Sequence, residues 1–205
     1  MAKTDIKSAF RILPSNPEDY HLLGMKWNGQ YYYDKCMPMG CSSSCKTFEF
    51  FSTAVEWTAQ DKLGIANLIH LRDDFLPIQT TESRCSRSLQ LFLDLCDFLG
   101  IPMAPEKTFG PSTILTFAGV ELDTIRCESR LPQEKVLTCQ ELITDFIKKK
   151  KATLRELQSL TGVLNFACSV VVPGRCFLRR LINLTIGLKR PGGRFSKARE
   201  NFSGP

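Results

Sequence analysis

The two adjacent carboxylates of Asp73 and Asp74, between apolar runs in segment 68–76, are the residues best suited to chemistry in this sequence. Two carboxylates near a core are costly unless a positive charge neutralises them. Apolar runs that are broken by a short polar turn predict a β-hairpin with the acids at its tip, and divalent metal ions are the usual reason to hold acids there. Asp5 lies in a similar setting in segment 3–10. Two separated acidic strand ends that could share a metal pair suggest phosphoryl transfer.

An Asp-Asp pair has a simpler interpretation, because solvated turns and helix N-caps also favour aspartate. On the pair alone that interpretation is the better one, since short motifs give many false positives. The order of the motifs around the pair is what favours a metal site.

Composition and length limit the classes of protein that the chain can belong to. Its 205 residues, 43% hydrophobic and 23% charged, are typical of a globular protein with one large domain or two small ones. No apolar stretch is long enough to span a membrane, and the N-terminus lacks the apolar core of a signal peptide. We therefore expect an intracellular protein, cytoplasmic or nuclear, that is not secreted and has no membrane partner.

The nine cysteines include no CxxC pair and are accompanied by only two histidines, His21 and His70. This pattern argues against a zinc site. We interpret the cysteines as reduced and mostly buried, which agrees with an intracellular location.

The net charge of +6 is divided unevenly along the chain. Residues 1–129 carry 12 Lys and Arg against 16 Asp and Glu, whereas residues 130–205 carry 15 against 5. The acidic part could hold metal ions, and the basic part, with a net charge of +10, could hold a phosphate backbone. The run Lys148–Lys151 is equally typical of a solvated helix end, so both interpretations of that run stay open.

Hydrophobic periodicity and turn signals predict mixed strands and helices in the first part of the chain. We expect strands at 5–13, 20–25, 29–33 and 114–122 (with a partner near Arg130), an acidic hairpin at 65–75, and helices at 45–63 and 83–99. The Asn28-Gly29 turn is a strong hairpin signal.

From Gln133 the pattern becomes helical throughout. We expect helices at 133–147, after the capping box that begins at Thr153, and at 175–188. The tail is rich in Gly, Arg and Ser, which is typical of disorder. The predicted organisation is α+β over residues 1–129, all-α over 130–190, and a basic tail over 191–205.

Several segments, in the order in which they stand, resemble the motifs of reverse transcriptases. They are Lys3-Thr4-Asp5-Ile6-Lys7-Ser8-Ala9-Phe10-Arg11 for the first palm motif, Met37-Pro38-Met39-Gly40 for the Pro-x-Gly loop, Leu71-Arg72-Asp73-Asp74 for the acidic hairpin, Leu99 to Thr108 for the lysine motif, Thr116 to Val120 for the primer-side hairpin, and Leu154 to Phe166 for the thumb. The resemblance covers about 185 residues. It implies a palm, formed by an antiparallel sheet with two packed helices, followed by an all-α thumb. The thumb block is most similar to that of retrotransposons of the DIRS and gypsy (LTR) type.

The resemblance also implies a role for each matching residue. Asp5 and Asp73 would coordinate two Mg²⁺ ions (with Mn²⁺ as a substitute), and Asp74 would complete the catalytic acids. The residues that would line the deoxynucleoside triphosphate site are Ile6, Phe10 (as the steric gate against a 2′-hydroxyl), Met39, Gly40 and Lys107 (beside pyrophosphate). Phe10 could equally be a plain core residue, and Lys107 a surface lysine.

The basic second part would bind an RNA or DNA template–primer through its shape and phosphates. The residues that we expect there are Lys148, Lys149, Lys150, Lys151, Arg155, Arg175, Arg179 and Arg180. The resemblance implies that fingers and RNase H segments would come from elsewhere in a parent polyprotein.

Two residues depart from the motif pattern. Arg72 stands where an apolar or small residue is usual. Its guanidinium is expected to compete with the metal ions for the carboxylates of Asp5 and Asp73, or to crowd the nucleotide. Pro77 stands in the returning strand, where proline is confined to edges, strand starts or bulges. Both substitutions fit a retroelement copy that is no longer under selection.

Three functional hypotheses follow from the sequence. The first is an RNA-directed DNA polymerase domain that transfers nucleotides to a primer 3′-hydroxyl. The second is a truncated, non-catalytic retrotransposon remnant that binds nucleic acid through its basic part. The third is a two-metal nuclease, which the lack of a further acid cluster or a catalytic histidine near Asp73 argues against.

Overall fold

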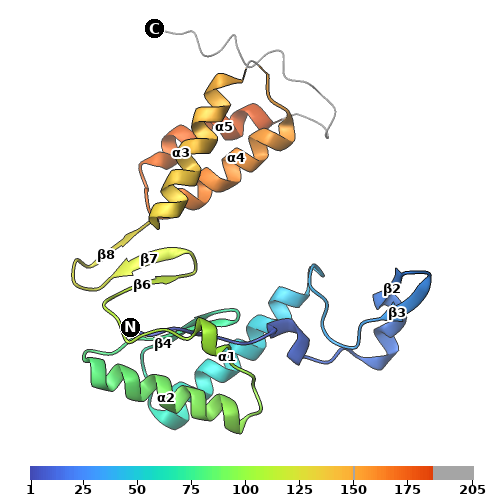
Figure 1. The fold of residues 1–205 in the computed structure, drawn as a ribbon, viewed down its shortest axis with the longest axis vertical. Helices are drawn as coiled ribbons and strands as arrows, with labels where there is room; N and C mark the ends of the chain where they lie inside the picture. The colour runs from blue at the N-terminus through green and yellow to red at the C-terminus, as the bar shows by residue number, and fades with distance from the viewer. Residues whose placement is uncertain (150, 187–205) are drawn as a thin grey trace. The chain divides into compact units, whose positions relative to one another are not determined.

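The computed structural model describes residues 1–149 and 151–186 of the chain. These residues form two compact units, which divide after Ala118 (Figure 1). The α+β fold class is confirmed, because antiparallel strands and helices alternate in the first unit. No helix in the described part of the chain is long and apolar enough to span a membrane.

The first unit is built on an antiparallel sheet of three strands in the order β1-β5-β4. The strands are β1 (Thr4–Asp5), β4 (Leu68–Leu71) and β5 (Asp74–Pro77), and two helices, α1 (Ser44–Leu63) and α2 (Glu82–Phe98), contact β4 and β5 respectively. A short 3₁₀ helix, η3 (Pro105–Lys107), and a further strand, β6 (Ile114–Phe117), follow. The acidic hairpin therefore lies in the middle of the most closely packed part of this unit.

Helix α1 packs its apolar stripe against the sheet. Phe48, Val55 and Ala59 recur at helical spacing and are buried together with Ser52. The helix ends at Gly64, whose φ of +66° lies in the left-handed region that glycine adopts without strain. The core that α1 covers also contains Phe75 of β5 and Phe92 of α2.

Two predicted strands near the N-terminus are wrong in extent. The strand expected over 5–13 ends at Asp5, because Ser8 takes a φ of +57° and begins a 3₁₀ helix, η1 (Ala9–Ile12). The strand expected over 20–25 begins only at Gly24. The Asn16 side chain accepts a hydrogen bond from the Glu18 amide and caps a second 3₁₀ helix, η2 (Pro17–Leu23).

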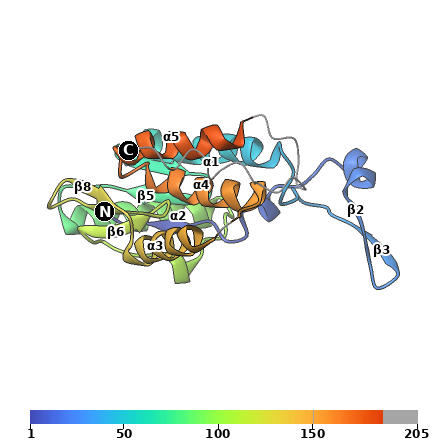
Figure 2. The same ribbon diagram turned by 90° about the horizontal axis from the view of Figure 1, so that it is seen from above.

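The β2–β3 hairpin (Gly24–Trp27 and Gln30–Tyr33) turns at Asn28-Gly29, as the sequence predicts. Figures 1 and 2 show it extending away from the helices of the first unit. The sequence predicts exposed apolar residues here, namely Leu22, Leu23 and Tyr31 to Tyr33. All of them are exposed except Leu23, which is half-buried. Low solubility of the isolated chain stays a prediction, based on this exposed apolar surface.

The second unit begins at Gly119 and combines a hairpin with three helices. Its elements are β7 (Val120–Asp123), β8 (Glu128–Arg130), α3 (Gln133–Lys148), α4 (Leu154–Ala167) and α5 (Gly174–Thr185). The sequence places a boundary after residue 129, whereas the compact unit also includes the β7–β8 hairpin. The expected tail at 191–205 lies outside the described residues.

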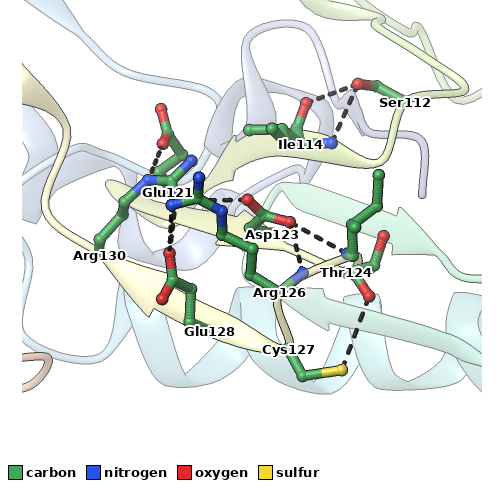
Figure 3. A network of polar contacts seen from close by, with 10 residues as sticks. Ser112, Ile114, Glu121, Asp123, Thr124, Arg126, Cys127, Glu128 and Arg130 are labelled. Atoms are coloured by element: carbon green, nitrogen blue, oxygen red, sulfur yellow. Dashed lines mark hydrogen bonds and ion pairs between the residues drawn. The ribbon is translucent and has the colours of Figure 1, made fainter.

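A network of charges holds the β7–β8 hairpin together (Figure 3). The Arg130 guanidinium donates to Glu121 at 2.5 Å, to Glu128 at 2.6 Å and to Asp123 at 3.3 Å. Asp123 is buried and also accepts the amides of Ile125 and Arg126, both at 3.0 Å. These amide hydrogen bonds, together with Arg130, hold the pKa of Asp123 below its usual range.

Helix α4 begins at the predicted capping box. The Thr153 hydroxyl accepts the Glu156 amide at 3.2 Å, and the Glu156 carboxylate accepts the Thr153 amide at 2.8 Å. An ion pair with Lys149 at 2.6 Å is the largest of several effects that lower the pKa of Glu156 to about 2.

We expect Thr153→Ala to destabilise the second unit by about 1 kcal/mol, because it leaves the Glu156 amide without a partner at the helix start. The measurement is urea unfolding followed by circular dichroism. Thr144→Ala is the matched control, because Thr144 lies inside α3 and its hydroxyl bonds only to the Gln140 carbonyl of the same helix. Equal unfolding free energies for the two variants would show that the cap contributes nothing.

Candidate active site

The acidic hairpin turns tightly, with Asp73 in the turn and Asp74 at the start of β5. Leu71 and Asp74 face each other across the hairpin, so the turn consists of Arg72 and Asp73 alone. Arg72 has a φ of +57°, which non-glycine residues seldom adopt but which the first position of a primed hairpin turn requires. The turn therefore positions one carboxylate at the tip and the next on the strand.

Strand register places Asp74 directly opposite Asp5 of β1. At the next position along the ladder Ile6 faces Asp73, and the Ile6 amide donates to the Asp73 carbonyl at 2.9 Å. Hydrogen bonds alternate along an antiparallel ladder, so Asp5 and Asp74 form a non-hydrogen-bonded pair, in which side chains lie closest. The structure thus brings Asp5 together with Asp74, while Asp73 stands beside them in the turn.

Lys107 reaches this pair from the other edge of β1. The segment before and after η3 is bonded to β1, with the Ala104 amide donating to Asp5 at 2.8 Å and the Lys3 amide to Phe109 at 2.8 Å. These bonds hold Lys107 over the sheet, where its ammonium lies 2.9 Å from both carboxylate oxygens of Asp5. Lys107 therefore contacts one of the acids, while its expected place beside pyrophosphate stays a prediction.

The acid cluster carries more negative charge than its surroundings neutralise. Burial, followed by the charges of Asp5 and Asp73, raises the pKa of Asp74 to about 6. Hydrogen bonds to Asp5 are the main reason that the pKa of Lys107 lies above its ordinary value. The charges of Lys107 and Lys3 thus neutralise the three carboxylates only in part, and a further cation would relieve their repulsion.

A divalent metal ion fits the chemistry of this cluster, because its donors are carboxylate oxygens. Within residues 1–149 and 151–186 no group of three or more His, Cys, Asp or Glu is arranged to hold a metal. Asp5, Asp73 and Asp74 are described residues, so in this structure they do not form such a group, and the Lys107 ammonium already lies on the oxygens of Asp5.

The other residues expected at a nucleotide site lie on three nearby segments. Ile6 is buried beside Asp5, and Phe10 packs edge-on against Phe48 at 5.3 Å between ring centroids. The plain core interpretation of Phe10 thus has support, since both rings belong to the core of the first unit. Met39 is 71% exposed in the loop before α1, and Gly40 takes a φ of +88° with open space around it. No contact joins this loop to the acids among the described residues.

The two residues that depart from the motif pattern occupy different settings. Arg72 is exposed, and in the described part of the chain the ion-pair partner of Asp5 is Lys107 rather than Arg72. Pro77 is buried at the end of β5, and its carbonyl accepts the Ala2 amide at 3.0 Å. A proline at this position ends the ladder with β1, because it has no amide N–H to donate the second hydrogen bond of the pair.

Within the acidic hairpin, His70 of β4 has a buried side chain whose partners the sequence did not predict. The side chain of His70 is 8% exposed, and its Nδ1 contacts Glu56 of α1. Its Nε2 lies 3.2 Å from Glu49, outside hydrogen-bond geometry. The ring stacks on Phe75 at 5.6 Å and fastens β4 to α1. The sequence signal was the alternation of Leu68 and His70 on the core face of the strand.

The basic residues expected to bind nucleic acid are exposed wherever the structure describes them. They are Lys148, Lys149, Lys151, Arg155, Arg175, Arg179 and Arg180, whereas Lys150 lies outside the described residues. Lys149 is paired with Glu156, so its charge is partly neutralised. The exposed arginines of α4 and α5 have no carboxylate partner in the described part of the chain.

Comparison with solved structures identifies the fold. The chain is similar to foamy viral protease–reverse transcriptase in its dRH form with double-stranded DNA, at a TM-score of 0.70 over 93% of this chain and 31% of that one. It is also similar to the same enzyme with an RNA/DNA hybrid, at a TM-score of 0.67 over 94% of this chain and 27% of that one. With double-stranded DNA the TM-score is 0.64 over 95% of this chain and 38% of that one. Sequence identity is 18% in each case.

The likeness shows that this chain has a reverse-transcriptase-like fold. The chain spans about a third of the length of the structures that it matches. No protein family matches the sequence by its profile, and no curated protein matches it either.

Proposed function

We propose that this chain is a reverse-transcriptase domain of a retroelement, of the DIRS or gypsy-like (LTR) type, that adds deoxynucleotides to a primer 3′-hydroxyl on an RNA or DNA template. The observation that carries the proposal is the cross-strand pair Asp5–Asp74 with Asp73 in the adjoining turn and Lys107 on Asp5. The reverse-transcriptase-like fold supports it.

Each part of the site has a chemical task in this proposal. Asp5 and Asp73, with Asp74 beside them, would hold two Mg²⁺ ions (or Mn²⁺), which when bound would activate the primer hydroxyl and neutralise the triphosphate. Lys107 supplies a further positive charge on the pyrophosphate side, and Gly40 with Met39, Ile6 and Phe10 lines the nucleotide site. The exposed basic residues of α3 to α5 bind the duplex backbone. The protein would act inside the cell, in the cytoplasm or nucleus, together with fingers and RNase H segments of a parent polyprotein.

A second candidate, a non-catalytic remnant that binds nucleic acid, is favoured by one specific observation. Lys107 already occupies both oxygens of Asp5, and Arg72 adds a second cation at the turn. In a remnant these cations would take the place of the metal ions, and the basic part alone would retain its binding surface.

The experiment that separates the two candidates is primer extension on an oligo-dT-primed poly-rA template with Mg²⁺ or Mn²⁺. The parent, Asp73→Asn and Arg72→Leu are compared, and duplex binding at low salt is measured in parallel. We expect the parent to extend the primer and Asp73→Asn to fail. Extension by Arg72→Leu alone would show that Arg72 inactivates an otherwise intact site. Duplex binding without extension by any variant would support the non-catalytic remnant.

A further inference from the structure

One lysine outside the sequence-predicted binding set is held in an unusual position in the second unit. Lys135 lies in the first turn of α3 and is half-buried. Its ammonium stands 4.1 Å from the ring centroid of Phe166 on α4. An ammonium at this distance from an aromatic face is attracted by the ring electrons. The contact fixes the position of a side chain that would otherwise be free to move.

A glycine makes room for this ammonium. Gly119 has a φ of +76°, and a Cβ built on it would lie 2.3 Å from Lys135 Nζ and 3.2 Å from the Phe166 ring. Atoms cannot approach so closely, so a side chain at position 119 would displace the flexible end of Lys135, and its φ also favours glycine. The Lys135 ammonium thus lies between a backbone turn and an aromatic ring.

The charge of Lys135 has no anionic partner in the part of the chain that the structure describes. No carboxylate pairs with it, and its three N–H donors meet no carbonyl or hydroxyl among these residues. Lys149 offers a contrast, because it lies 5.7 Å from the Phe146 ring but also donates to Glu156 at 2.6 Å. A cation–π contact leaves the hydrogen-bonding capacity of an ammonium unused.

We infer that Lys135, held by Gly119 and Phe166, is a binding site for a phosphate of a nucleic-acid backbone. An ammonium with free donors is suited to one phosphate oxygen, and the net charge of +10 over residues 130–205 favours a polyanion over a free phosphate ion. The inference rests on the proposed nucleic-acid binding and adds a residue to it. Because the site recognises a phosphate and no base edge, it contributes affinity without sequence preference.

The test is the salt dependence of duplex binding, measured by fluorescence anisotropy on the full chain between 50 and about 200 mM salt, the range over which phosphate contacts change affinity most. We expect Lys135→Gln to lower the slope of log K against log salt by about 0.9, equally for duplexes of different sequence. Arg126→Gln is the matched control. It removes one charge from the same unit, but Arg126 is exposed and lies 3.8 Å from Glu128, so its slope should equal that of the parent.

Lys135→Met serves as a second variant, because it removes the ammonium and keeps the apolar stem beside Phe166. If Lys135→Gln unfolds, as judged by its melting curve, the Met variant is compared instead. A parent that binds duplex, with an unchanged slope in the Lys135 variants, would overturn this inference and leave the proposed function intact. A parent that binds no duplex at all would overturn both.

Discussion

Replacing Asp5 with asparagine is expected to reduce templated nucleotide addition by at least about 10²- to 10³-fold, the loss typical of removing one electrostatic element from an active site. Asp5 is 6% exposed and faces Asp74 across the sheet, with Lys107 on its two oxygens. Asparagine has the same shape but one neutral carbonyl oxygen and an amide, so it holds a divalent cation poorly. The measurement is primer extension under single-turnover conditions with Mg²⁺.

The loss should not come from unfolding. Lys107 is 57% exposed at its side chain, and ion pairs with such exposed partners contribute about 0–1 kcal/mol. Neutralising Asp5 also removes one of the charges that raise the pKa of Asp74, which offsets the lost pair. The melting temperature of Asp5→Asn should therefore stay close to that of the parent.

Asp97→Asn is the control for this substitution. It makes the same chemical change on α2, where Asp97 is exposed, and it should leave extension unchanged. If Asp5→Asn extends primers as well as the Asp97 variant does, the carboxylate cluster is not the active site.

Local signals in the sequence predict those parts of the fold that short-range physics determines. The Asn28-Gly29 turn and the Thr153 capping box are correct because turn and cap chemistry act over three or four residues. The strand expected over 5–13 is wrong after Asp5, because its apolar alternation carries no sign that Ser8 takes a left-handed conformation. Apolar residues then pack from a 3₁₀ helix instead of a strand.

The candidate site shows the same division between local and long-range information. Placing Asp73 in a turn needs only the pattern of segment 68–76. The neighbour of Asp5 depends on strand register, which couples residues 69 positions apart and makes Asp74 the cross-strand partner. The alternation with Leu68 places His70 on the core face, but the sequence does not predict the partners of His70 or Lys135. Glu56 and Phe166 become their neighbours only through tertiary packing.

One aromatic pair packs beneath the acidic hairpin. Phe75 directly follows Asp74 on β5, and its ring lies 4.8 Å from that of Phe92 on α2. Both side chains are fully buried in the core of the first unit. A change in Phe92 therefore reaches the acid cluster only through the core.

We expect Phe92→Ala to destabilise the first unit by about 3–5 kcal/mol, because it removes a buried ring and leaves a cavity that the helix and sheet fill only in part. Domains of this size are stable by about 5–15 kcal/mol, so the variant would lose much of its stability and its extension activity together. Urea unfolding followed by circular dichroism measures the change.

Phe98→Ala provides the matched control at the end of the same helix. Phe98 is 85% exposed, and substitutions at such surface positions usually change stability by less than about 0.5 kcal/mol. The two variants remove the same atoms from the same helix, so the difference between their free energies of unfolding measures the effect of burial. If Phe92→Ala unfolds at the same urea concentration as Phe98→Ala, then the Phe75–Phe92 contact does not support the hairpin.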